Sequence, residues 1–175
     1  NYIDAWQGSG MPRFFWNSVV VTIPAVILTL ALASMVAFVV SRYSFRFNIT
    51  LLMIFTAGNL LPAQLVFIPV FRLYLEIPVP EWINNREVLY DTFPGLILIH
   101  VAFQKGFATF VLSNYMKTIP KEISESAMVD GAGVLRHFVS IMLPLLRPPL
   151  ASLAVLMTTW IYNDFFWAVV LSKTG

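Results

Sequence analysis

The sequence has no cysteine and few charged residues. Without cysteine there are no disulfide bonds and no thiolate metal ligands, and the redox compartment stays unspecified. Only 11% of the 175 residues are charged, whereas a water-soluble domain has about 25%. Hydrophobic residues make up 58%, and the mean hydropathy is +0.77. A soluble domain of this length could not cover so much apolar surface, so lipid is the solvent that fits the composition.

Several chemistries are excluded by missing residues. There are two histidines, and because they lie far apart we expect no metal site. No Gly-x-x-x-x-Gly-Lys-Ser/Thr phosphate loop occurs, so the chain does not hydrolyse ATP itself, and we expect no catalytic residues and no enzyme activity. Lys and Arg occur in short strips between apolar runs. Nucleic acid is therefore not expected as a partner, despite the net charge of +2.

Four apolar segments follow one another along the chain. A helix needs about 20 residues to cross the roughly 30 Å of hydrocarbon in a bilayer, and each segment reaches that length. The first carries no charged residue, and it is far longer than the roughly 7 to 15 apolar residues of a signal peptide. The sequence predicts an all-α, polytopic membrane helical bundle with about four spans, at residues 14–41, 47–71, 93–112 and 148–171.

Polar residues and prolines interrupt the second segment, which contains Asn59, Pro62, Gln64 and Pro69. Such breaks are tolerated where neighbouring helices satisfy the carbonyl groups that they free. A helix break at Pro62 and Gln64 beside a translocation path fits this pattern, and so does a simple packing kink.

The distribution of Lys and Arg predicts the orientation of the spans, because cytoplasmic loops carry the excess of these residues. If all four segments cross, the first and third connections lie on one side. That side has seven basic residues against four on the other, which favours a cytoplasmic third connection. The seven are Arg42, Arg46, Lys105, Lys117, Lys121, Arg136 and Arg147; the other side has Arg13, Arg72, Arg86 and Lys173, with the acidic Asp4, Glu76, Glu81, Glu87 and Asp91.

The third connection, residues 113–149, has too few consecutive apolar residues to cross a membrane and is not polar enough to be disordered. Pro120 fits a first helical position, and residues 121–130 continue with good helix formers. Gly131 and Gly133 then end the helix, as glycine does where the backbone turns with positive φ. This pattern predicts the first half of a helix-turn-helix elbow on the cytoplasmic face.

A second helix at residues 134–143, which would stop at Pro144, completes the elbow. The two helices together carry a spaced motif: Glu125-Ser126-Ala127, then Gly131, then Ile141-x-Leu143-Pro144. This resembles the EAA motif of binding-protein-dependent ABC importer permeases, which is Glu-Ala-Ala, three residues, Gly, nine residues and Ile-x-Leu-Pro. Ser126 is the only departure, and it keeps a small side chain.

Further runs over nearly the whole chain resemble the carbohydrate-uptake branch of these importers, in particular its MalG-like permeases. They are residues 14–18 (FFWNS), 61–64 (LPAQ), 68–69 (IP), 119–123 (IPKEI) and 128–132 (MVDGA), and the pattern Trp160-x-x-Asn163-Asp164-Phe165.

The resemblance implies the MetI-like permease fold, whose core of about six spans would place the second to the fifth in this chain. Residues 1–175 would then be an excerpt of one transmembrane permease domain in the bacterial cell membrane, with the coupling loop at 113–149. The implied function is translocation of a sugar or sugar-like solute. The implied partners are a second permease subunit, two ATPase subunits that bind the ATP, an extracytoplasmic solute-binding protein and membrane lipid, with no cofactor on this chain.

In this family the elbow inserts into a cleft on the ATPase subunit. Acidic side chains would meet a basic cleft, and small side chains would permit close approach. An ordinary amphipathic helix at the membrane interface is the alternative for the elbow alone. The predicted ATPase-docking residues are Glu125, Ser126, Ala127, Asp130, Gly131 and Ala132.

Three polar residues are predicted to line the substrate pathway: Asn163, Asp164 and Gln64. An acidic side chain within a span is costly and usually faces a cavity or a partner, which applies to Asp164. Structural capping near the outer interface is the alternative for Asn163 and Asp164.

Two other functions compete with an importer subunit. Half of a secondary transporter would use His100 and Lys105 as a proton relay, although residues five apart on one helix point in different directions. An intramembrane serine protease would need Ser34 to meet His100 across two spans, yet no Gly-x-Ser-x-Gly elbow accompanies them.

Overall fold

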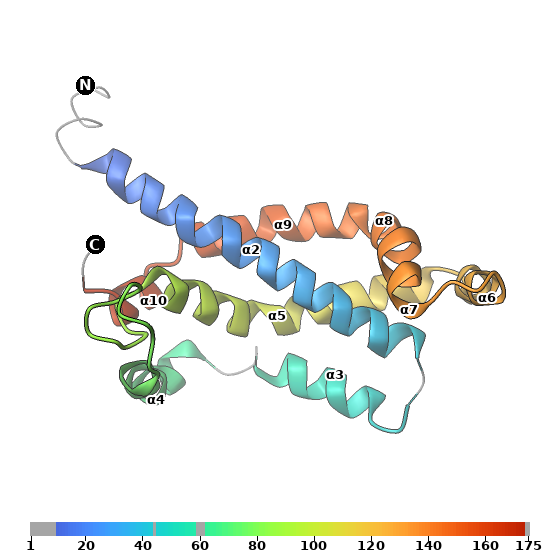
Figure 1. The fold of residues 1–175 in the computed structure, drawn as a ribbon, viewed down its shortest axis with the longest axis horizontal. Helices are drawn as coiled ribbons and strands as arrows, with labels where there is room; N and C mark the ends of the chain where they lie inside the picture. The colour runs from blue at the N-terminus through green and yellow to red at the C-terminus, as the bar shows by residue number, and fades with distance from the viewer. Residues whose placement is uncertain (1–9, 44, 59–61, 174–175) are drawn as a thin grey trace. The chain divides into compact units, whose positions relative to one another are not determined.

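The computed structural model describes residues 10–43, 45–58 and 62–173. Asp4, Asn59 and Leu61, which enter the sequence analysis, lie outside the described residues. In the described part there are helices and no strand, with one isolated antiparallel bridge between Pro78 and Val88. The helices are α2 (Met11–Arg42), α3 (Asn48–Ala57), α4 (Ala63–Glu76), α5 (Phe93–Thr118), α6 (Lys121–Val129), α7 (Val134–Arg136), the π-helix η2 (His137–Met142), α8 (Leu143–Leu145), α9 (Arg147–Tyr162) and α10 (Phe166–Leu171) (Figure 1).

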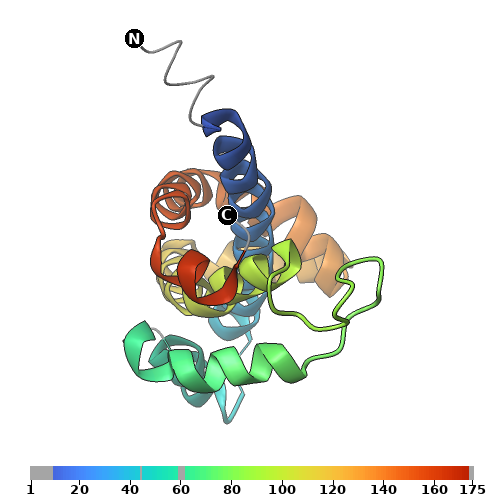
Figure 2. The ribbon, with the colours of Figure 1, turned by 90° about the vertical axis from the view of Figure 1, so that its left-hand side faces the viewer.

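The described residues form two compact units, and α2, α5 and α9 each contribute residues to both. The first unit contains residues 10–26, 62–101 and 158–173, and in it α4 packs against α10 (Figure 2). The second unit contains residues 27–43, 45–58 and 102–157, and in it α6 packs against η2, which is continuous with α7 and α8. The two candidate sites below lie in different units.

Among the described residues, two helices are long and apolar enough to cross a membrane, α2 with 32 residues and α5 with 26. They coincide with the first and third predicted spans, and α5 begins at Phe93 as predicted. A third span results if Val134–Leu145 and Arg147–Tyr162 are taken together, although these two segments meet at an angle of 72°. The structure thus has two clear spans, or three with this bent pair, where the sequence predicts about four.

The second predicted span, residues 47–71, is not one continuous helix. Helix α3 has 10 residues and is followed by Gly58, and α4 has 14 residues and is preceded by Pro62. Each is shorter than the roughly 20 residues that a crossing requires. Pro62 has a ψ of 129°, which is extended backbone and cannot continue a helix. The break at Pro62 is therefore a real helix end, whereas Pro69 lies inside α4.

The predicted fourth span, residues 148–171, is also interrupted. Helix α9 ends at Tyr162 and α10 begins at Phe166. The Asn163 side chain donates to the Thr159 carbonyl at 2.7 Å, and such local bonds compete with the helical ladder. A carboxylate oxygen of Asp164 accepts the backbone N–H of Trp167 at 3.1 Å. Asn163 thus contributes to the end of α9, and Asp164 contributes to the start of α10.

Candidate coupling elbow and polar cavity

The first helix of the elbow, α6, has well-defined ends. The sequence predicts Pro120 as its first helical residue, whereas in the structure Pro120 is the N-cap. Gly131 has a φ of +74°. The Gly131 N–H donates to the Met128 carbonyl at 3.0 Å, and the Ala132 N–H donates to the Ala127 carbonyl at 2.9 Å. This pair of bonds is a Schellman motif with glycine at its left-handed position. The prediction of a positive φ is confirmed at Gly131.

Gly133 does not share this conformation, because its φ is −64°. The prediction that both glycines turn the chain through positive φ is therefore wrong for Gly133. The Schellman motif already satisfies the last carbonyls of α6. Gly133 instead precedes the next helix as its N-cap, in extended backbone.

Two faces of α6 differ in exposure. Ser124 and Ala127, three residues apart, are buried, as expected for one side of a helix. The other five predicted docking residues lie outside this buried face: Glu125, Ser126, Asp130 and Gly131 are exposed and Ala132 is half-buried. Ala127 therefore holds α6 in place rather than facing outward.

Large apolar side chains lie exposed at the elbow beside these polar and small residues. Val129 is 87% exposed, Leu135 74% and Val134 60%. A patch of exposed apolar side chains with polar residues around it indicates a surface that contacts another protein or lipid.

The second half of the elbow is longer than predicted. Pro144 does not end it, because α7, η2 and α8 run on continuously to Leu145. In η2 the Leu143 N–H donates to the carbonyl of Phe138, five residues back. This wider turn comes just before Pro144, whose ring would otherwise clash with the carbonyl four residues back. Pro144, which has no N–H to donate, then lies in α8 directly after this wider turn.

Aromatic packing joins the elbow to α2. The Phe38 ring centroid lies 5.1 Å from that of His137 and 5.1 Å from that of Phe138. Both elbow residues are buried in η2. Edge-to-face and tilted ring pairs at this spacing stabilise packing beyond the area that they bury. These rings therefore fix the second half of the elbow against the end of α2.

Arg42, at the end of α2, fixes the end of α5, a contact that sequence reasoning missed. Its Nη2 donates to the Met116 carbonyl at 2.8 Å and to the Ile119 carbonyl at 3.1 Å. A cation is stabilising at a helix C-terminus, where carbonyls lack partners. The contact places the end of α2 beside the end of α5.

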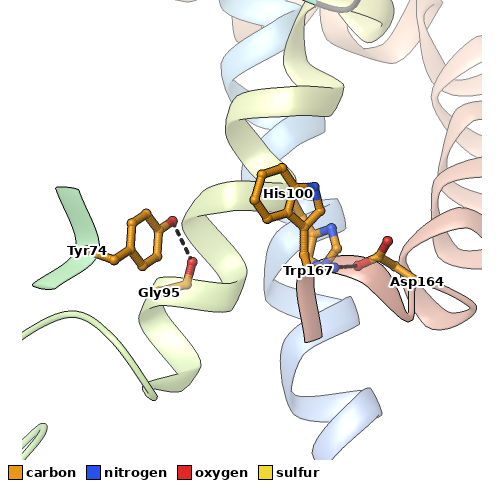
Figure 3. Close-up of polar contacts among 5 residues, drawn as sticks. All are labelled: Tyr74, Gly95, His100, Asp164 and Trp167. Atoms are coloured by element: carbon orange, nitrogen blue, oxygen red, sulfur yellow. Dashed lines mark hydrogen bonds and ion pairs between the residues drawn. The ribbon is translucent and has the colours of Figure 1, made fainter. Parts of the chain in front are cut away.

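A polar cavity of about 200 Å³ lies in the first unit, between the beginnings of α2 and α5 and the end of α9. The Nε2 atom of His100 lies 3.9 Å from Oδ2 of Asp164, the same oxygen that accepts the Trp167 N–H (Figure 3). His100 is buried, as is Thr22. The polar lining comprises Asn17, Ser18, Thr22, His100, Tyr162, Asp164 and Ser172.

Of the three predicted pathway residues, only Asp164 lines this cavity. Asn163 is exposed and bonds the backbone of α9, and Gln64 is exposed on the first turn of α4. Asp164 also accepts the N–H of Trp167 at the start of α10, which supports the capping alternative, while its place in a substrate pathway stays a prediction. The sequence analysis names His100 and Asp164 for different roles, but their spacing along the chain does not predict that the two side chains lie close together.

The residues of the competing functions have other partners. The Lys105 ammonium lies 4.7 Å from the centroid of the Phe55 ring, a cation–π contact, while His100 faces Asp164. The Ser34 hydroxyl donates to the Ala31 carbonyl at 2.8 Å. These contacts support neither a His100–Lys105 relay nor an activated Ser34.

Close packing sets the start of α5 beside this cavity. The buried Tyr74 hydroxyl donates to the Gly95 carbonyl at 2.9 Å (Figure 3). Burial raises the pKa of Tyr74 to about 12, so the hydroxyl stays a donor. A Cβ at Gly95 would lie 2.7 Å from the Leu89 carbonyl oxygen. Only glycine fits this approach of α5 to the preceding loop.

Comparison with known proteins identifies the family. The model described as "Binding-protein-dependent transport system inner membrane component" matches residues 26–174. The chain belongs to this family. A family of inner membrane components agrees with the two long apolar helices, so the protein is a multi-pass membrane protein.

Similar members of the family are permeases named for sugar uptake. The chain is 34% identical to the diacetylchitobiose uptake system permease protein NgcG of Streptomyces coelicolor, over 98% of this chain and 54% of that protein. It is 33% identical to the alpha-glucoside transport system permease protein AglG of Rhizobium meliloti, over 100% of this chain and 45% of that protein. The chain thus spans about half the length of the curated relatives that it matches.

A solved structure shows the same fold. It is a bacterial ABC transporter involved in the import of the acidic polysaccharide alginate, with a TM-score of 0.74 and 23% identity, over 93% of this chain and 54% of that chain. The all-α, MetI-like permease fold predicted from the sequence is confirmed.

Proposed function

We propose that this chain is part of the membrane-spanning subunit of an ATP-driven importer for a sugar or sugar-like solute. The family match and the permease fold support an importer subunit. The relatives named for diacetylchitobiose and alpha-glucoside uptake favour a saccharide as the solute.

The observation that carries the proposal is the construction of the elbow. A Schellman motif and the rings around Phe38 hold it, yet Glu125, Asp130 and Val129 stay exposed on it. Because these contacts hold the elbow in place, its exposed surface has a fixed shape. A fixed surface with apolar residues beside acidic ones fits a protein partner with a basic cleft. That partner is the ATPase subunit, and Glu125, Ser126, Asp130, Gly131 and Ala132 make the contact.

The assembly contains further subunits. A second permease completes the translocation path, two ATPases bind the ATP, and an extracytoplasmic solute-binding protein delivers the solute, all at a bacterial cell membrane. The chain itself needs no cofactor and performs no catalysis. Its residues 1–175 act as one permease domain, and residues 113–149 hold the coupling loop.

Asp164 is the residue through which this chain contacts the solute path. With His100, Asn17 and Thr22 it gives the polar cavity both donors and acceptors. Asn163 and Gln64 lie outside that cavity and would contribute at other points along the path.

The energy source of uptake tests the proposal and separates it from a secondary transporter, which the His100–Asp164 pair would suit as a proton relay. Inverted membrane vesicles that contain the complete transporter are prepared with and without ATP, and with and without a protonophore. We expect saccharide movement, with the binding protein on the substrate side, to require ATP and to persist when the proton gradient is collapsed. Uptake that follows the gradient and ignores ATP would favour the proton-coupled carrier.

A further inference from the structure

A second cavity, of about 550 Å³, lies in the second unit where α2 and α5 end and α6 begins. Its charged lining residues are Arg42, Lys117, Lys121 and Glu125, and its apolar ones include Ile49 and Leu52 of α3. Of these residues, Glu125 is also one of the exposed acidic residues of the elbow.

The cavity carries an excess of positive charge. Arg42, Lys117 and Lys121 oppose the one carboxylate of Glu125, so three cations against one anion leave a local charge of +2. No ion pair joins any of the three cations to a carboxylate in the part of the chain that the structure describes. Arg42 is held by two carbonyls through Nη2, and its Nε is buried without a hydrogen-bond partner among the described residues. A multivalent anion would complete this set of donors.

The position of the cavity points to a lipid as the source of that anion. Arg42 and Lys117 lie in the last turns of the two helices that are long enough to cross a membrane. This places the cations at the level of phospholipid headgroups, on the side that the charge count assigns to the cytoplasm. Basic pockets between spans on that side suit anionic headgroups.

Helix α3 supplies the apolar half of the site. None of its residues is buried, and Ile49 is 69% exposed, Ile54 66% and Met53 61%. Ile49 also lines the cavity, so the apolar surface of α3 is continuous with the cationic site. A free phosphate ion would use the cations but would leave this surface in water, whereas a phospholipid uses both.

We propose that this cavity binds an anionic phospholipid, with its phosphate held by Arg42, Lys117 and Lys121 and its acyl chains lying along α3. Because Glu125 and Lys121 both belong to α6, the lipid would bridge the coupling helix to the ends of α2 and α5. The proposal does not depend on the transported solute.

Native mass spectrometry of the purified full-length subunit, without its ATPase, tests the proposal with phosphatidylglycerol and phosphatidylcholine as probes. We expect retention of phosphatidylglycerol in preference to phosphatidylcholine. The double variant Lys117→Gln/Lys121→Gln should bind phosphatidylglycerol about 30-fold more weakly, since each cation near a headgroup strengthens binding by about fivefold. Lys117→Arg/Lys121→Arg should keep the affinity, which separates charge from folding.

Arg147→Gln is the matched control, because Arg147 is an exposed basic residue of the same unit that does not line the cavity. It should leave lipid retention unchanged. An equal loss in Arg147→Gln and in the double variant would overturn the site, and so would equal retention of the two lipids. Displacement of the lipid by millimolar inorganic phosphate would identify a free-anion site instead. Displacement by added ATPase subunit would identify a protein as the occupant, and it would contradict the proposal.

Discussion

Asp164 shows at the scale of one residue how a single carboxylate acquires two structural contacts. One oxygen accepts the Trp167 N–H that begins α10, and the same oxygen faces His100 across the polar cavity. A neutral oxygen can accept that N–H as well as a charged one can. A substitution can therefore remove the negative charge of Asp164 and keep its hydrogen bond to Trp167.

We expect Asp164→Ala to lower the free energy of unfolding by about 0.5–2 kcal/mol, the usual cost of a lost cap. Asp164→Asn keeps an acceptor oxygen and should lose less. Both should reduce uptake if the carboxylate contacts the solute. Denaturant titration of the purified subunit in detergent, run beside uptake, measures the two effects. Equal unfolding free energies for Asp164→Ala and the unsubstituted protein would contradict the cap.

Gly95 is a residue whose requirement the sequence does not reveal. A Cβ there would meet a backbone oxygen at 2.7 Å, and a backbone atom cannot move aside as a flexible side chain can. Gly95→Ala should destabilise the subunit by about 1–3 kcal/mol, as overpacking does. Gly58→Ala is the control, because Gly58 has a φ of −58° and no atom within 4 Å of a built Cβ. Thermal unfolding measures the difference. Equal melting temperatures for Gly95→Ala and Gly58→Ala would contradict the close approach of Gly95 to the Leu89 carbonyl oxygen.

At the scale of elements, the sequence predicts best where one signal dominates. Apolar length predicts α2 and α5, although the segment of α5 contains His100 and Lys105. Good helix formers followed by Gly131 predict α6 and its left-handed cap. These are local properties, so one sequence is sufficient to find them.

The elements that were missed depend on contacts between distant residues or on backbone geometry. Apolar length alone does not show that the Asn163–Asp164 pair ends a helix, and at Pro62 the sequence leaves a helix break and a packing kink open. Pro144 looked like a helix end because the π-helix that accommodates it has no signature in composition. The Arg42 contact with the end of α5 and the pairing of His100 with Asp164 join residues more than sixty positions apart, beyond the reach of periodicity.

Cysteine labelling tests the orientation of the elements. A cysteine at Gly133 should react only from the cytoplasmic side, because the position is exposed and a Cβ there meets no atom within 4 Å. Asn84 is a poor outer site, since its amide donates to the Val88 and Tyr90 carbonyls and holds the loop together. Its exposed neighbour Asn85 should instead react only from outside.

Two outcomes of this experiment separate different errors. Labelling of Gly133→Cys and Asn85→Cys from the same side would contradict the number of crossings between them. Labelling from exchanged sides would keep that number and reverse the orientation that the Lys and Arg count predicts.

At the scale of the whole molecule, the proposed function requires that ATP hydrolysis on a partner subunit reaches this chain through a contact surface. The elbow is that surface in our proposal, because packing holds it on one side and its acidic and apolar residues are exposed on the other.

The most direct test is ATPase co-purification measured beside uptake in the intact transporter. Glu125→Lys reverses an exposed charge, and like charges across an interface cost several kcal/mol. Gly131→Val forces a β-branched residue to a φ of +74°, which is strongly disfavoured. Ser126→Ala and Gly133→Ala are the controls, since the first keeps a small side chain and the second lies at negative φ in open space.

We predict that Glu125→Lys and Gly131→Val insert normally, retain at most about a tenth of the ATPase because the contact loses more than about 1.4 kcal/mol, and lose uptake. Both controls should match the unsubstituted transporter. Full uptake with full ATPase retention in both Glu125→Lys and Gly131→Val would show that the elbow does not couple the chain to ATP hydrolysis, and it would contradict the account.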